Sequence, residues 1–315
     1  MRKLVYLTSA LWWMLWAGAA QAGPIRVSYP SPSANYLALI VGVQKGIYPQ
    51  HGIEVEAVRI RTATTAAQAL IAGNITFSLG GPSAGLLAIN KGAPLVMVMG
   101  LINTPQYHVY GIPEVKSLRD LKGKRVGSGA AGGMPDFVMR TALRSAGLTP
   151  ADVQLQAIAG EENRFVALES KVIVANAFTP PSSFRAEKMG FRKLAALKDL
   201  VKDYQGDLVY AHKELLHNNP DVVEKFVKAT LQTIQYMKKN KAETVGVLMD
   251  FTKVDRDLAE LTYDDMVPVM PDDGSINVKG VEAMQEYFRS VGVQTGETPP
   301  PSQYIVTRFI GKGSK

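Results

Sequence analysis

The chain has 315 residues, 46% of them hydrophobic and 20% charged, which is enough apolar material for one large domain or two ordinary ones. It has 35 lysines and arginines against 28 acidic residues, a net charge of +7, and its cations form no basic stripe, so nucleic-acid binding is not expected. Because the chain contains no cysteine, disulfide bonds, a thiol nucleophile and a lipid-modified cysteine are excluded.

The first 22 residues have the pattern of an export signal. Arg2 and Lys3 form a basic start, Leu4 to Ala19 is almost wholly apolar, and Ala20-Gln21-Ala22 fits an A-x-A cleavage site. The apolar run is too short for a confident membrane span, so an uncleaved N-terminal anchor is the less favoured alternative. We therefore expect a signal peptide cleaved after Ala22 and a mature protein in the periplasm.

From Ile25 onward, short apolar runs alternate with amphipathic stretches, which predicts parallel β-α units and an α/β fold. The first set of predicted strands is 25–29, 53–60, 75–80 and 94–102, with helices at 36–46, 64–73 and 84–92. The pattern restarts after residues 107–110, with predicted strands at 124–129, 153–160 and 172–178 and helices at 135–147 and 163–170.

The last third of the sequence is predicted to be mostly helical. Asn219 can cap a helix, and Pro220 suits its first position, because proline lacks the N–H that would be unpaired there. Two more helices are expected near 256–266 and 279–291, and the proline run 299–301 should begin a tail.

Gly127, Gly129 and Gly132 fit the G-x-G-x-x-G pattern of dinucleotide-binding turns, between a predicted strand and a predicted helix. A dinucleotide site also needs an acid about 20 residues further on, at the end of the next strand. Glu161 and Glu162 come too late for this role, and an exported protein does not meet NAD. We favour a backbone cradle for an anion or polar ligand, with a merely tight turn as the alternative.

The segment Gly81-Pro82-Ser83-Ala84-Gly85 matches G-x-S-x-G, the nucleophile elbow of α/β-hydrolases. The acid and histidine that a hydrolase needs at later strand ends are not evident, so we favour a serine that contacts a ligand over a catalytic one. Four histidines and no cysteine give no zinc motif, and Asp272-Asp273-Gly274 is typical of a turn. We expect no metal and no cofactor.

Polar and aromatic residues gather just after the predicted strands, where parallel strands bring their loops to one edge of a sheet. Any one of them alone is more simply explained as a helix N-cap, so their convergence is the functional signal. The expected ligand-binding residues are Ser31, Ser33, Asn35, Tyr36, Arg61, Thr62, Thr64, Thr65, Gly81, Ser83, Ser128, Gly129, Gly132, Gly133, Asn163, Arg164, Phe178 and Thr179.

Three segments carry a resemblance to a known family. They resemble the nitrate/sulfonate/taurine and thiamine-precursor group of ABC-transporter solute-binding proteins. The segments are QKGIYPQHGIEVEAVRI, AAQALIAGNITFSLGGPSAGLLAINKGAPLVMV and SLRDLKGKRVGSGAAGG. The resemblance spans roughly 25–292. It implies a periplasmic binding protein of type II-like fold, with two α/β lobes, a hinge and a ligand cleft between the lobes. It also implies that the protein is not an enzyme.

On this basis lobe 1 is expected to comprise 23–106 and 212–315, and lobe 2 to comprise 107–211, with crossovers near 105–111 and 207–212. The resemblance implies a monomer that binds one small polar solute and delivers it to a membrane permease with its cytoplasmic ATPase. A sensory ligand-binding module is an alternative, and an α/β serine hydrolase is the least favoured one.

The ligand is the most open question. Helix N-termini after several strands, with Arg61 and Arg164 nearby, favour an anion such as a sulfonate or carboxylate. Tyr36, Tyr107 and Phe178 could instead clamp a flat ring, such as a pyrimidine precursor of thiamine. Residues 170–177 depart from the Gly-x-Val/Ile-Asp-Ala of the family, which leaves the chemistry near Thr179 open. A fungal branch makes a pyrimidine with a cysteine-rich segment, an activity not expected here.

Overall fold

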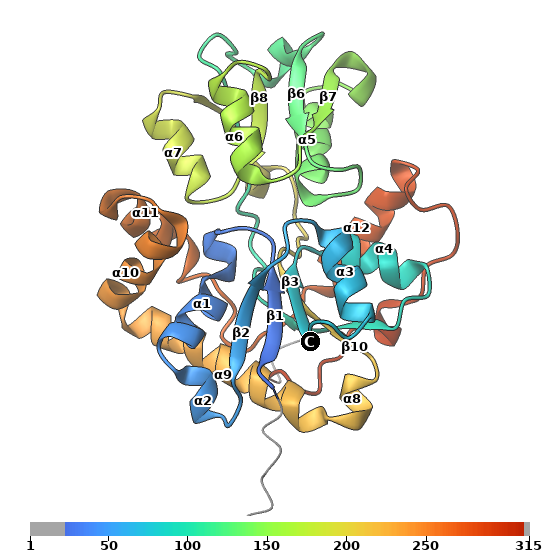
Figure 1. Cartoon of the computed structure of the whole chain (residues 1–315). Helices are drawn as coiled ribbons and strands as arrows, with labels where there is room; N and C mark the ends of the chain where they lie inside the picture. Colours follow the sequence, from blue (N-terminus) through green and yellow to red (C-terminus); the bar gives the residue numbers. More distant parts are fainter. Residues whose placement is uncertain (1–22, 312–315) are drawn as a thin grey trace, which may run out of the picture.

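The computed structural model describes residues 23–311, so the predicted signal peptide lies outside the described residues. The chain forms two α/β lobes, one above the other in Figure 1, and each contains a five-stranded sheet. In lobe 1 the strand order is β2-β1-β3-β10-β4. These strands are β1 (Ile25–Tyr29), β2 (Val55–Arg59), β3 (Phe77–Gly80), β4 (Leu95–Gly100) and β10 (Leu208–His212).

The sheet of lobe 2 repeats this arrangement, with the order β7-β6-β8-β5-β9. Its strands are β5 (His108–Gly111), β6 (Arg125–Ser128), β7 (Gln154–Ala157), β8 (Ala175–Phe178) and β9 (Arg192–Ala196). In each sheet, one strand that enters from the other lobe is inserted antiparallel to both of its neighbours: β10 between β3 and β4, and β5 between β8 and β9. The predicted parallel units are present in the pairings of β1 with β2 and β3 and of β6 with β7 and β8, but the two antiparallel strands were not predicted.

Helices cover both faces of the lobe 1 sheet, with α1, α9, α10 and α11 on one side and α3, α4 and α12 on the other (Figure 1). The helices of lobe 1 are η1 (Ala34–Tyr36), α1 (Leu37–Gln44), α2 (Ile47–Gln50), α3 (Ala63–Ile71), α4 (Pro82–Asn90), α8 (Leu215–Asn218), α9 (Pro220–Lys239), α10 (Lys241–Thr252), α11 (Arg256–Met266), α12 (Val278–Ser290) and η5 (Pro301–Gln303). The helices of lobe 2 are η2 (Leu118–Leu121), α5 (Met134–Ser145), η3 (Pro150–Asp152), α6 (Glu161–Glu169), α7 (Ser182–Lys188) and η4 (Leu197–Asp199).

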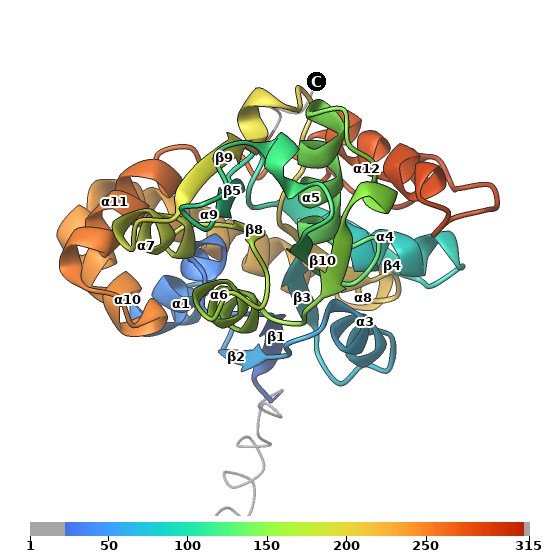
Figure 2. The ribbon, with the colours of Figure 1, turned by 90° about the horizontal axis from the view of Figure 1, so that it is seen from above.

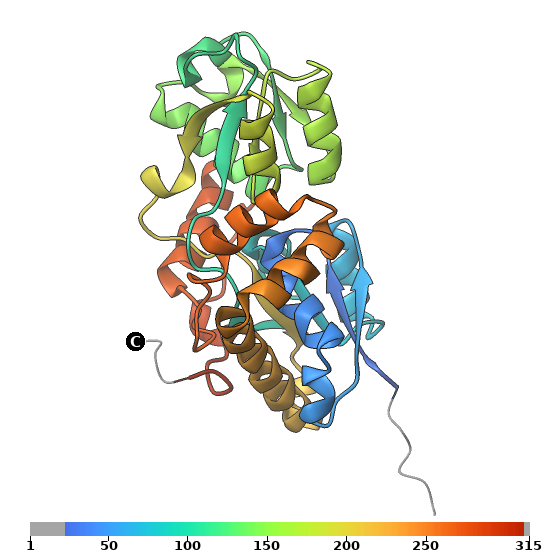
Figure 3. The ribbon, with the colours of Figure 1, turned by 90° about the vertical axis from the view of Figure 1, so that its left-hand side faces the viewer.

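The C-terminal third returns to lobe 1, as Figure 3 shows from the side. The predicted helices near 256–266 and 279–291 are confirmed as α11 and α12. Asn219 occupies the N-cap position of α9, but its side chain makes no capping hydrogen bond. The residues after Pro299 do not form a loose tail, because Ile305 bridges to Met97 at the edge of the lobe 1 sheet.

The two crossovers between the lobes run side by side. The Gly206 N–H donates to the Ile102 carbonyl at 2.8 Å, and the Leu101 N–H donates to the Asp207 carbonyl at 2.9 Å. A β-carbon at Gly206 would lie 2.9 Å from the Ile102 oxygen, so the close approach requires glycine. Because β10 belongs to the lobe 1 sheet, the second crossover ends before Leu208, earlier than the expected boundary between 211 and 212. Within 23–311, no helix is long and apolar enough to span a membrane.

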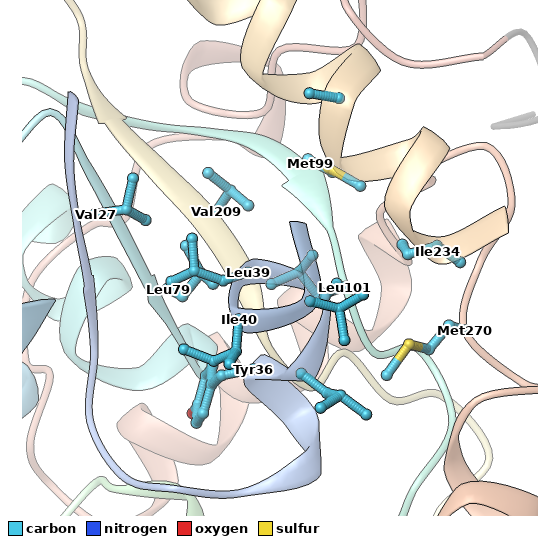
Figure 4. Close-up of a cluster of buried hydrophobic side chains, with 14 of the residues drawn as sticks. Val27, Tyr36, Leu39, Ile40, Leu79, Met99, Leu101, Val209, Ile234 and Met270 are labelled. Carbon is cyan, nitrogen blue, oxygen red and sulfur yellow. The ribbon is translucent and has the colours of Figure 1, made fainter. Parts of the chain in front are cut away.

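A continuous hydrophobic cluster joins α1 to the sheet of lobe 1 (Figure 4). Leu39 of α1 lies there beside Leu79 of β3 and Val209 of β10, so the helix is fixed directly over the strands. In the same cluster Phe226 of α9 stacks on Phe77 with ring centroids 4.2 Å apart, and on Tyr48 with centroids 5.5 Å apart. The long helix α9 is thereby anchored to the sheet through Phe226.

We expect Phe226→Ala to lower the free energy of unfolding by about 3–5 kcal/mol, because it removes a buried ring from a stacked trio and leaves a cavity. Leu261→Ala is the matched control, since Leu261 is 53% exposed and its loss should change stability by less than about 0.5 kcal/mol. Urea unfolding followed by circular dichroism measures both. Equal effects of the two substitutions would contradict the assignment of Phe226 to the core.

Candidate functional site

A cavity of about 580 Å³ lies between the lobes and is lined by residues of both. Lobe 1 contributes the loops after β1, β2 and β3, and lobe 2 contributes the loops after β6, β7 and β8. The crossovers supply the remaining lining through Tyr107, Tyr204, Gly206 and Asp207. A volume of this size suits a small organic solute.

Most of the site residues predicted from the sequence line this cavity. They are Ser31, Ser33, Asn35, Tyr36, Arg61, Thr62, Thr64, Gly81, Ser83, Gly129, Gly132, Gly133, Arg164 and Thr179. Some of them also act as helix N-caps, which is the simpler explanation offered for such residues in the sequence. The Thr62 hydroxyl accepts from the Thr65 N–H at 3.2 Å, and the Ser33 hydroxyl accepts from the Asn35 N–H at 3.4 Å. Ligand contact by these residues therefore remains a prediction.

Four predicted residues lie outside the lining, each for a local reason. Thr65 is exposed and held by the Thr62 cap, and the Asn163 amide donates back to the Ala159 carbonyl at 2.9 Å. The Ser128 hydroxyl points instead to Asp136, at 3.0 Å. Phe178 is fully buried and packs on Phe165, with ring centroids 5.2 Å apart, so it is a core residue of lobe 2 and does not form a ring clamp.

The N-termini of α3, α4, α5 and α6 all begin at the cavity. Each presents unpaired backbone N–H groups and the positive end of a helix dipole to the lining. The glycines before α5 leave this backbone uncovered, and Gly132 has a φ of +78°, which favours glycine at that position. The convergence of helix N-termini expected from the sequence is thus present.

Asp207 is a lining residue that the sequence reasoning missed. Its carboxylate accepts hydrogen bonds from the Tyr36 hydroxyl at 2.7 Å and from the Asn35 amide. Burial raises the pKa of Asp207 above its usual value, and the two neutral donors oppose that shift only in part. The signal available in the sequence was a single acid directly before the apolar run LVYA, a context in which a carboxylate becomes buried.

A second, largely buried carboxylate, Glu161, whose side chain is 13% exposed, lies in lobe 2 at the first position of α6. It accepts from the Thr179 hydroxyl at 3.2 Å and lies 4.0 Å from the guanidinium of Arg164, one turn further along the helix. Burial raises the pKa of Glu161, while Arg164 and the hydrogen bonds lower it. Arg164 also donates to the Ile158 carbonyl at 3.2 Å, so part of its donor capacity is already used.

Three tyrosines, Tyr36, Tyr107 and Tyr204, complete the lining, and Tyr36 and Tyr204 are each only 6% exposed. Burial raises the pKa of Tyr107, and the charges of Glu161 and Asp207 raise it further. Both carboxylates therefore act on the same phenol, although Glu161 belongs to lobe 2 and Asp207 to the crossover that leads into lobe 1. The lining combines two acidic groups with rings that can stack on a flat molecule.

The lining offers no catalytic apparatus of the kinds considered from the sequence. Ser83 lies near the start of α4, but no histidine is among the residues that line the cavity. Within residues 23–311, no group of three or more histidines and acids is placed to hold a metal ion. The arrangement is suited to recognition by hydrogen bonds, charge and aromatic contact.

A family model described as NMT1/THI5 like matches residues 33–244, which is more than half of the chain. The chain belongs to the NMT1/THI5-like family. A binding protein of Brucella abortus, whose name specifies no ligand, is 26% identical over 325 residues and covers 99% of both chains. The formylaminopyrimidine-binding protein of Halalkalibacterium halodurans is 22% identical over 224 residues, which is 69% of this chain and 67% of the relative.

Among solved structures, the alkanesulfonate-binding protein SsuA of Xanthomonas axonopodis bound to MOPS aligns with a TM-score of 0.78 and 18% identity, covering 92% of this chain and 100% of that chain. At this identity the likeness establishes the fold alone. It confirms the type II-like periplasmic binding protein fold for this member of the NMT1/THI5-like family. The resemblance found in the sequence is confirmed as well.

The buried state of Asp207 predicts a pH-dependent stability. Because burial raises the folded-state pKa above the unfolded value of about 3.9, the stabilising contribution is complete below that unfolded value and is lost as the pH rises through the folded pKa. Asp207→Asn removes the titration. We expect the free energy of unfolding of the wild type, minus that of the variant, to fall in urea titrations as the pH is raised above about 4. A difference independent of pH would contradict the burial of this carboxyl.

Proposed function

We propose that this protein is the solute-binding component of an ABC importer in the periplasm, and that it binds a flat nitrogen heterocycle of the aminopyrimidine class between its lobes. The ligand is handed to a membrane permease without covalent change. Exchange between a separated and a closed arrangement of the lobes is driven by the tighter binding of ligand to the closed one.

The observation that carries the ligand class is the pair of buried carboxylates, Asp207 and Glu161, one from each side of the cavity. An aminopyrimidine presents an exocyclic amino group, whose N–H groups donate well to carboxylates. Its flat ring matches the aromatic surfaces of Tyr36, Tyr107 and Tyr204. Family membership and the relative named for formylaminopyrimidine support the same class.

The lining contains three cations, Arg61, Lys91 and Arg164, against the two carboxylates, so its net charge alone does not decide between an anion and a ligand that carries an amino group. Arg61 is exposed at the rim, and Arg164 is engaged by Glu161 and by a main-chain carbonyl. A further negative charge beside two buried carboxylates would be opposed by repulsion and by the loss of its hydration. A sulfonate remains the second candidate on one observation, the four helix N-termini that begin at the cavity.

We expect formylaminopyrimidine to bind with a dissociation constant near micromolar, about −8 kcal/mol, and MOPS to bind far more weakly, in isothermal titrations at neutral pH. Asp207→Asn should weaken aminopyrimidine binding by roughly 10- to 100-fold, since it removes a hydrogen bond to a charged group worth about 1.5–3 kcal/mol.

Asp250→Asn is the control for the change of net charge. Asp250 is exposed in α10 of lobe 1 and lies outside the cavity, so this variant should bind like the wild type. Tight binding of MOPS with no response to formylaminopyrimidine would overturn the proposed class in favour of a sulfonate. Turnover of either compound would overturn the assignment as a binding protein.

A further inference from the structure

The most heavily bonded carboxylate outside the cavity is Asp136, the third residue of α5, which is 2% exposed. It accepts from the Ser128 hydroxyl at 3.0 Å, the Gly132 N–H at 3.0 Å and the Arg140 guanidinium at 2.9 Å, all within lobe 2. Its fourth donor is the hydroxyl of Tyr287 at 2.8 Å. Tyr287 belongs to α12, which packs on α4 of lobe 1, so this bond joins the two lobes.

The same carboxylate shapes the cavity. Residues 129–133 form the glycine loop, which lines the cavity between β6 and α5. Ser128 precedes this loop and Gly132 lies near its end, so Asp136 holds the loop at both sides. One oxygen, Oδ2, accepts from both the Gly132 N–H and the Tyr287 hydroxyl. Loop conformation and contact between the lobes therefore share one acceptor atom.

Apolar side chains pack closely around this bond, beside the guanidinium of Arg140. Tyr287 is 5% exposed and meets Phe137 edge to face, with ring centroids 4.9 Å apart. A β-carbon at Gly132 would lie 3.3 Å from Val293 and 3.5 Å from Leu87, so the loop itself touches lobe 1. Burial first, and the bond to Asp136 next, raise the pKa of Tyr287, so its hydroxyl stays protonated and remains a donor at physiological pH.

The ion pairs between the lobes are of a different kind from this buried bond and the apolar contacts around it. Arg59 pairs with Glu162 and Lys188 pairs with Asp255, and these side chains are 33–56% exposed. Exposed pairs of this kind contribute little and separate readily in water. Seen from above, α7 and α11 lie side by side at one flank, whereas α5 and α12 meet at the other (Figure 2). The buried bond at the second flank is thus the directional contact between the lobes.

We propose that Tyr287 is a positioning residue for ligand binding: its hydroxyl, acting through Asp136, fixes the glycine loop in its ligand-binding form when the lobes are together. The inference rests on the proposed function, because it concerns the same cavity. When the lobes separate, Oδ2 of Asp136 loses one donor and the loop loses its support from lobe 1. Ligand binding and closure are coupled through this one hydroxyl group.

Tyr287→Phe removes the hydroxyl and keeps the ring. We expect it to weaken formylaminopyrimidine binding by roughly 10- to 100-fold, mainly through faster dissociation in stopped-flow measurements. The matched control is Tyr110→Phe, since the Tyr110 hydroxyl also donates to a carboxylate, Glu187 at 3.0 Å, but entirely within lobe 2. This control should lower the melting temperature to a similar degree and leave affinity and dissociation rate unchanged.

A second readout does not depend on the ligand. Because the chain has no native cysteine, spin labels at introduced cysteines, Lys122→Cys in lobe 2 and Lys228→Cys in lobe 1, report the distance between the lobes. Without ligand, Tyr287→Phe should shift the distances toward longer values than in the wild type or in Tyr110→Phe. Unchanged distances, or equal shifts in both variants, would overturn the role of Tyr287. If the wild type fails to bind formylaminopyrimidine while the distances still shift, the proposed ligand class fails and the coupling through Tyr287 stands.

Discussion

The antiparallel insertion of one crossing strand into each sheet is the constraint on which the rest of the structure depends. In a sheet of parallel strands, the carboxyl ends form the binding edge, and an antiparallel strand begins at that same edge. β5 begins at His108 opposite the end of β8, and β10 begins at Leu208 opposite the end of β3. The residues directly before these strands, Tyr107 and Asp207, are therefore delivered to the cavity.

This geometry explains which part of the site could be predicted from the sequence and which part could not. The loops after the parallel strands, near Ser31, Thr62, Ser83 and Gly129, could be predicted. The apolar runs and the glycine, proline and polar residues that follow them mark where each strand ends. Asp207 precedes its strand, and a single acid before an apolar run does not reveal the long-range strand pairing on which its position depends. The prediction for Phe178 is wrong for a related reason: although it is the last residue of β8, its ring is covered by Phe165 of α6, the helix that precedes this strand.

The buried carboxylates lower the free energy of unfolding, and this cost favours a role in recognition over a role in stabilising the fold. Asp207 is held by two neutral donors, Asn35 and Tyr36, which do not fully offset the loss of water around a carboxylate. Glu161 has Arg164 beside it, but burial remains the dominant influence on its pKa. Groups that violate the usual rules for a stable core concentrate at functional sites. Under the proposed function, the N–H donors of a ligand add to the hydrogen bonds that these oxygens already accept.

The contacts between the lobes are consistent with a closing movement whose equilibrium a small ligand can shift. A ligand shifts such an equilibrium only by its differential affinity, so the closed form cannot be strongly favoured without it. Exposed ion pairs such as Lys188–Asp255 satisfy this condition, because water replaces them at little cost. The buried bond between Asp136 and Tyr287 adds direction, since it forms at a single relative placement of α5 and α12. With weak ion pairs at one flank and one specific hydrogen bond at the other, the ligand's binding free energy can determine whether the lobes are separated or closed.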